Sequence, residues 1–134
     1  MDEGVNFKAL FMWFFVFVGG VVYVRSHYTL EDVLKYSRER PHPVLSPKVD
    51  YYVGWAYFHR EDHPKAHKAF DQLLTSYPTC QYAPPALYRK GLMYTEDGRW
   101  AQAREVLERY LKEFPNAREK SRVERNYERI KFRK

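Results

Sequence analysis

Residues 84–116 place apolar and small side chains at steps of three and four, which is the period of an α-helix. Asp97-Gly98 interrupts this pattern and Pro115 ends it, because such residues favour turns and helix ends. The segment is therefore predicted to form two short amphipathic helices joined by a tight turn. The periodic positions are Leu87, Gly91, Tyr94, Ala103, Leu107, Tyr110 and Leu111.

The same pattern occurs once more, 37 residues earlier, in residues 47–79. Several positions sharing one fixed offset indicate an internal repeat. Pro41 lies a further 37 residues before Pro78, so residues 29–40 take the place of the second helix of a preceding unit. The matched pairs are Gly54 with Gly91, Tyr57 with Tyr94, Ala66 with Ala103, Phe70 with Leu107, Leu74 with Leu111, and Pro78 with Pro115.

Two further helices flank the repeats. Thr29 can cap a helix over residues 29–39, with Asp32 three residues later in an incomplete capping box. Residues 117–134 contain no Gly or Pro, and Glu128 stands where Gly91 stands in the repeat. A charged residue at a close-packing position argues against another full unit, so this basic tail is predicted to be a capping helix with a polar outer face.

The N-terminal region carries no charge between Ala9 and Val24. Counted from Val5, it provides 20 residues, enough to cross a hydrocarbon core about 30 Å thick as a helix. A buried core helix and a cleaved signal peptide are the alternatives. Asp2 and Glu3 argue against the signal peptide, so we predict an uncleaved single-pass anchor. Its membrane-facing residues include Ala9, Phe14, Phe17 and Val22.

The predicted fold is all-α, with one transmembrane helix followed by a short array of helical hairpins. The expected parts are an N-terminal tail and anchor (1–26), a connecting helix and Pro-rich linker (27–46), a first repeat (47–79), an extended linker with a second repeat (80–116), and the capping helix (117–134).

Composition and motifs argue against a disulfide, a metal site and a catalytic site. The single cysteine, Cys80, excludes an internal disulfide and a cysteine-based metal cluster. His59, His63 and His67 are spaced by four, but Pro64 places a turn between them, so they do not share one helix face. Phosphate-loop and nucleophile-elbow motifs are missing from the sequence. We expect no enzyme activity, cofactor or metal, and the charge of +6, concentrated in the tail, lacks a nucleic-acid-binding motif.

The two units resemble tetratricopeptide repeats, with small residues where paired helices approach, aromatic residues between them and a closing proline. The linker 78–84 extends the usual period of 34 residues by three. In this respect it resembles bacterial cell-envelope members of the family, such as the Tol-Pal-associated coordinator and the repeat lipoprotein of outer-membrane assembly. The chain departs from them in lacking a lipidated cysteine, a cleavable signal and a full set of repeats.

The resemblance implies a concave groove lined by the first helix of each unit, aromatic at one end and basic at the other. The family's carboxylate clamp of Lys and Asn is absent, because Tyr51 and Tyr88 stand at its first position. The alternative is that the helix at 29–39 covers Tyr51 and Trp55. The predicted groove residues are Tyr51, Trp55, Phe58, Tyr88, Leu92, Arg122, Arg125 and Arg129.

The expected function is that of a membrane-anchored adaptor, which docks a peptide or helix of another membrane or envelope protein and contacts lipid through its anchor. The alternative is a permanent accessory subunit of a respiratory, photosynthetic or secretion complex. Because two repeats bury little surface, the fold is expected to depend on the anchor helix or on a partner.

The side of the membrane is left open by two opposing signals. Arg25, Lys35, Arg38 and Arg40 follow the anchor while Lys8 precedes it, which favours a cytoplasmic repeat domain. The resemblance to envelope proteins favours the periplasmic side of a bacterial inner membrane, and that is the side we expect.

Overall fold

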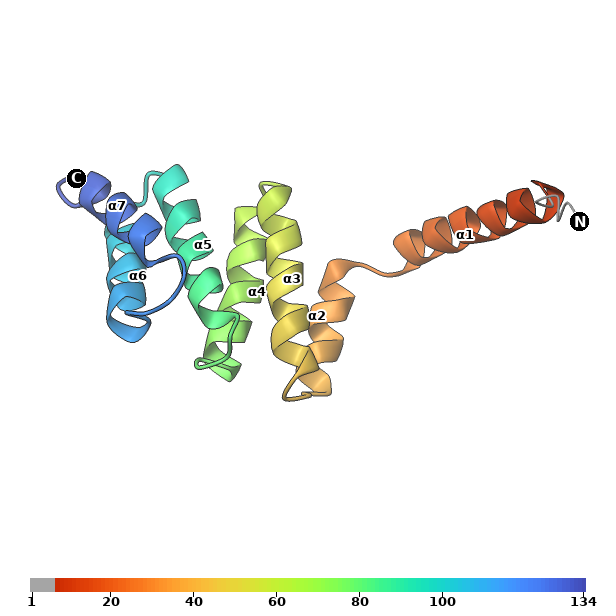
Figure 1. Cartoon of the computed structure of the whole chain (residues 1–134), viewed down its shortest axis with the longest axis horizontal. Coiled ribbons are helices and arrows are strands. Elements are labelled where there is room, and N and C mark those ends of the chain that lie inside the picture. The colour runs from red at the N-terminus through yellow and green to blue at the C-terminus, as the bar shows by residue number, and fades with distance from the viewer. Residues whose placement is uncertain (1–6) are drawn as a thin grey trace, which may run out of the picture.

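The computed structural model describes residues 7–134, which form seven α helices (Figure 1). The all-α prediction is confirmed for this part of the chain. Asp2, Glu3 and the predicted start of the anchor at Val5 lie outside the described residues. The helices are α1 (Phe7–His27), α2 (Leu30–Glu39), α3 (Leu45–His59), α4 (His63–Ser76), α5 (Ala83–Glu96), α6 (Trp100–Glu113) and α7 (Lys120–Ile130).

Helix α1 stands apart from the others and projects away from the array (Figure 1). It has 21 residues, and an 18-residue window within it reaches a mean hydropathy of 2.0, so it is long and apolar enough to cross a membrane. None of its residues is buried; Phe14, Phe17 and Val22 are 58%, 71% and 61% exposed, and Ala9 is partly exposed. Helix α1 therefore adds no buried residue to the core, and the expectation that the fold depends on the anchor helix or on a partner stays a prediction.

The capping residues start α2 as predicted. The Thr29 Oγ1 accepts a hydrogen bond from the Asp32 backbone N–H at 3.3 Å, and the Thr29 N–H donates to Asp32 Oδ2 at 2.8 Å. The capping box is thus complete, which satisfies two donors at the helix N-terminus. Helices α2, α4 and α6 end at Glu39, Ser76 and Glu113, and these ends are 37 residues apart.

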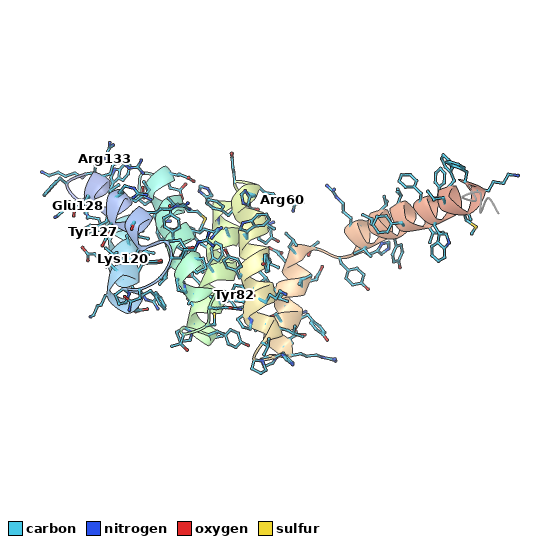
Figure 2. The ribbon with its side chains drawn as sticks, in the orientation of Figure 1. Arg60, Tyr82, Lys120, Tyr127, Glu128 and Arg133 are labelled. Atoms are coloured by element: carbon cyan, nitrogen blue, oxygen red, sulfur yellow. The ribbon has the colours of Figure 1, made fainter. Side chains whose placement is uncertain are left out.

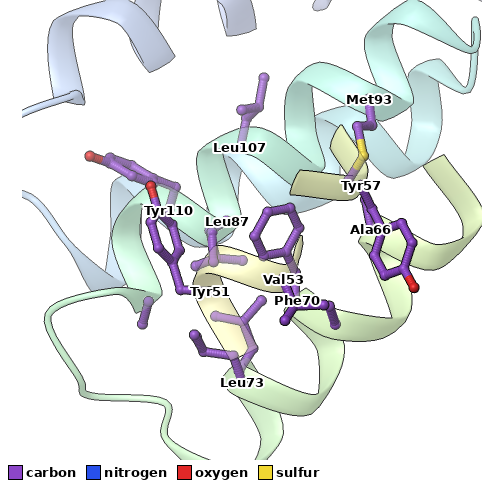
Figure 3. Packing of buried hydrophobic residues seen from close by; sticks show 14 of the residues in the cluster. Tyr51, Val53, Tyr57, Ala66, Phe70, Leu73, Leu87, Met93, Leu107 and Tyr110 are labelled. Carbon is purple, nitrogen blue, oxygen red and sulfur yellow. The ribbon is translucent and has the colours of Figure 1, made fainter. Parts of the chain in front are cut away.

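The helices from α2 to α7 stack side by side in chain order (Figure 1). Helices α3 and α4 form one antiparallel hairpin and α5 and α6 form the next, while α7 packs on α6. Their facing sides share one apolar core, which Figure 3 shows from close by. Phe70, Leu73, Leu107 and Tyr110 have no exposed surface, so the second helix of each hairpin contributes fully buried residues to this core.

Glycines allow the two helices of each hairpin to approach closely. A Cβ added at Gly54 would lie 2.6 Å from Phe70 Cε1, and one added at Gly91 would overlap the side chain of Leu107. Both contacts would be shorter than a normal van der Waals contact. The repeat therefore pairs a glycine on the first helix with a large apolar residue on the second, at the same 37-residue offset.

We expect Gly54→Ala to destabilise the fold by about 1–3 kcal/mol, because the added methyl group overlaps the Phe70 ring. Phe70→Leu should restore part of this loss when combined with Gly54→Ala, although it is destabilising alone. Urea unfolding of the full chain in detergent, followed by circular dichroism, measures both effects. An unchanged unfolding midpoint for Gly54→Ala would contradict the close approach.

Candidate functional site

The predicted groove residues lie on the first helix of each unit, as expected. Helix α3 carries Tyr51, Trp55 and Phe58, and α5 carries Tyr88 and Leu92. The three arginines lie on α7 at the end of the array farthest from α1 (Figure 1). The aromatic and basic parts are therefore at different places along one array. Figure 2 labels Lys120 at the start of α7, well apart from Tyr82.

Tyr51 is a core residue, which corrects its predicted role as an open anchor. Only 9% of it is exposed, its ring stacks on Tyr82 with centroids 5.1 Å apart, and the Arg89 guanidinium lies 5.4 Å from its centroid. Burial raises the pKa of its hydroxyl. The covering residues come from the linker before α5 and from the middle of α5. The alternative that the helix at 29–39 covers Tyr51 and Trp55 stays a prediction.

The remaining aromatic residues keep accessible surface. Trp55 is 40% exposed and packs edge-on against His59 at 4.2 Å, while Phe58, Tyr88 and Leu92 are half-buried. A ligand would therefore meet one open indole beside partly open side chains. Tyr and Trp of this kind are frequent binding hot spots.

Tyr52 adds a ring that sequence reasoning missed. It is 51% exposed and lies edge-on to Tyr82, with centroids 6.2 Å apart. The adjacent tyrosines at 51 and 52 were visible in the sequence. Which of them stays open depends on the position of Tyr82, and no periodicity predicts that position.

Helix α7 closes the far end of the array. Val123 and Ile130 are buried against α6, and Arg104 donates a hydrogen bond to the backbone oxygen of Arg133 at 2.6 Å. Glu128 stays exposed at the position where Gly91 meets Leu107 in the unit before. A charged residue at this close-packing position agrees with the predicted capping helix. Arg122, Arg125 and Arg129 are exposed on it.

In the described residues, His63 and His67 contact neighbouring helices. His63 Nδ1 lies 2.7 Å from Asp97 Oδ1, which joins the start of α4 to the end of α5. The His67 ring stacks on Tyr94 at 4.3 Å, with both of its nitrogens buried and unpaired. Within residues 7–134 no group of His, Cys, Asp and Glu could hold a metal ion. Cys80 is half-buried in the linker.

A polar chain links α2, α3 and α4, and sequence reasoning missed it. Arg38 Nη2 donates to Gln72 Oε1 at 2.8 Å, and Gln72 Nε2 donates to Asp50 Oδ1 at 3.1 Å. Asp50 is 1% exposed, and this burial raises the pKa of its carboxyl. The next unit has Leu87 at the position equivalent to Asp50, so hydrogen bonds here take the place of an apolar contact. The three hydrogen-bonded residues border a hollow of about 390 Å³.

Residues 54–118 match the tetratricopeptide repeat family. The matched segment runs from the middle of α3 to just beyond α6, so it covers most of the two hairpins. A search of curated proteins finds no match. Repeat arrays of this kind act through extended surfaces that bind other proteins.

We expect the fold to lose stability as the pH falls from about 6.5 to about 4, partly through His67. Burial, and then the nearby Lys90, lower the pKa of His67 from 6.5 to about 4. In that window the unfolded chain binds a proton that the folded chain does not, so acidification favours unfolding. His67→Phe, which keeps a ring against Tyr94, should flatten this decline. Melting curves of both proteins between pH 4 and pH 7.5 measure it, and parallel curves would contradict the assignment.

Proposed function

We propose that this protein is a membrane-anchored adaptor, which binds a peptide or helix of another membrane or envelope protein on its repeat array. The single observation that carries the proposal is the combination of an exposed apolar helix with a repeat array. Helix α1 has the length and composition of a membrane span, and two tetratricopeptide-type hairpins follow it. Such arrays bind other proteins, so anchoring one to a bilayer restricts its partners to the membrane and its surface.

The chemistry of the docked segment follows from the surface that stays open. Trp55 and the half-buried Tyr88 and Leu92 suit apolar side chains of a ligand. The exposed arginines of α7 suit acidic residues, which would also be steered toward the surface at low salt. We therefore propose a segment with apolar anchors near α3 and α5 and acidic residues near α7.

The accessory-subunit alternative is favoured by a separate observation. Tyr36 and Val33 on α2 are 60% and 39% exposed, although they occupy positions that are buried in the other units. A permanent partner would cover them. An adaptor exchanges its partner when free competitor is added, whereas an accessory subunit does not.

Trp55→Ala combined with Tyr88→Ala should reduce partner recovery from detergent-solubilised membranes at least tenfold, since losing two partly buried aromatic contacts costs more than about 1.4 kcal/mol. Quantitative mass spectrometry of the purified complex measures this. The matched control, Glu105→Ala with Lys112→Ala, changes exposed residues on α6 and should leave recovery unchanged. A double variant with native melting behaviour and full recovery would exclude the proposed groove.

A further inference from the structure

We propose that the first end of the array is a helix-binding site, and that an acidic amphipathic helix of another protein fills it. This site lies on α2 and the adjoining side of α3, and it is distinct from the aromatic and basic surface discussed above. We call it the open end. Its apolar residues are Leu30, Val33, Tyr36, Leu45, Val49 and Ala56.

The repeat offset shows which residues of α2 lack their cover. Phe70 and Leu107 stand at 37 and 74 residues after Val33, and both have no exposed surface, whereas Val33 is 39% exposed. Leu73 and Tyr110 bear the same relation to Tyr36 and are equally buried, whereas Tyr36 is 60% exposed. The equivalent positions belong to the core in two units, whereas Val33 and Tyr36 of α2 are open to solvent.

Helix α3 also has side chains that lack their cover, on the side next to α2. Ala56 is only half-buried, while Met93 and Ile130, at the equivalent positions of α5 and α7, are 0% and 1% exposed. Val49 is also half-buried, while its equivalents Ala86 and Val123 have no exposed surface. The uncovered positions on α2 and α3 therefore belong to one face.

The complete units show what kind of element covers this face. Phe70 is covered by α3 at Gly54, and Leu107 is covered by α5 at Gly91, so the missing element is a helix. Two hollows of about 470 and 630 Å³ line the open end, and both border Val33. Helix α5, which has 14 residues, shows the length that one unit accommodates.

Helix α1 does not cover the open end, although Val24 and Arg25 near its C-terminal end line the larger of the two hollows. It immediately precedes α2 in the chain but points away from the array (Figure 1), and it buries none of its residues. Phe17 stands 37 residues before Gly54, so α1 has a large ring where the other units have a glycine. The covering helix must therefore come from outside residues 7–134.

The charge around the two hollows selects an acidic helix. Their linings contain no Asp or Glu but five basic side chains. Within the described residues, Arg25 and Arg60 have no carboxylate within 4.0 Å, whereas Lys65 is paired with Asp62 at 3.6 Å and with Glu31 at 3.9 Å. Unpaired cations at the rim of an apolar groove favour acidic residues on the helix that enters it. The basic residues are Arg25, Arg40, His42, Arg60 and Lys65.

The same charge argues against a second copy of this chain. Two open ends would bring equal sets of cations together, and the exposed face of α7 is basic as well. An anionic bilayer would cover more of α2 than the two hollows and would also meet Glu31, Asp32 and Glu39, which are exposed but do not line them. A helix of another protein is the occupant that fits both the shape and the charge.

The test places a photoreactive benzoylphenylalanine at Tyr36 or at Leu45 of the full chain in its native membrane. We expect both positions to crosslink to one segment of one other protein, identified by mass spectrometry. That segment should have apolar residues at i, i+3 or i+4, and i+7, and more acidic than basic residues. Val33→Glu should reduce both crosslinks at least tenfold. Because Val33 is partly exposed, the melting temperature of this variant should stay close to that of the parent protein.

Phe132→Glu is the matched control, because it adds the same charge at an exposed apolar residue on the far end of the array. It should leave the crosslinks unchanged. The proposal is wrong if the adduct is a lipid, a second copy of the chain or a segment without this pattern. It is equally wrong if the yield does not exceed that of a probe at Lys112, or if Val33→Glu has no effect.

Discussion

The close approach of a glycine-bearing helix to a large apolar residue is the contact on which the array depends. It occurs between Gly54 and Phe70 and again between Gly91 and Leu107. In each case the large residue is completely buried, because the helix in front of it can come near enough to exclude water. Repeating this contact in both hairpins places a fully buried residue of α4 and of α6 in the shared core.

A stack built on a repeated contact has two ends, and the two ends of this array differ. Helix α7 closes one end by burying Val123 and Ile130, with the charged Glu128 at the place of the glycine. At the other end α2 offers Val33 and Tyr36, and no helix among residues 7–134 covers them. The open end adjoins the candidate membrane span, so the unsatisfied part of the fold is the part held nearest to α1.

The sequence was sufficient to predict those features that depend on residues close together in the chain. Periodicity indicated the hairpins and the tail helix, and the cap at Thr29 formed as its chemistry requires. These signals need only residues a few positions apart. The resemblance to envelope proteins, the groove and the membrane role stay predictions, because neither the fold nor the family match identifies a partner.

Features that join distant segments could not be predicted. Tyr51 is buried because Tyr82 reaches it from an extended linker, and a linker has no period from which its path can be read. The hydrogen bonds from Arg38 through Gln72 to Asp50 cross three helices. The open end became visible only when exposed and buried side chains at equivalent positions could be compared.

Native-state hydrogen exchange of the full chain in detergent tests most directly that the array is incomplete at α2. An end helix without its covering neighbour should open without unfolding the rest of the array. The account predicts that amides of α2 exchange through openings of lower free energy than amides of α4, although both are second helices of their units. Equal protection of α2 and α4, lost together in one global transition, would contradict it.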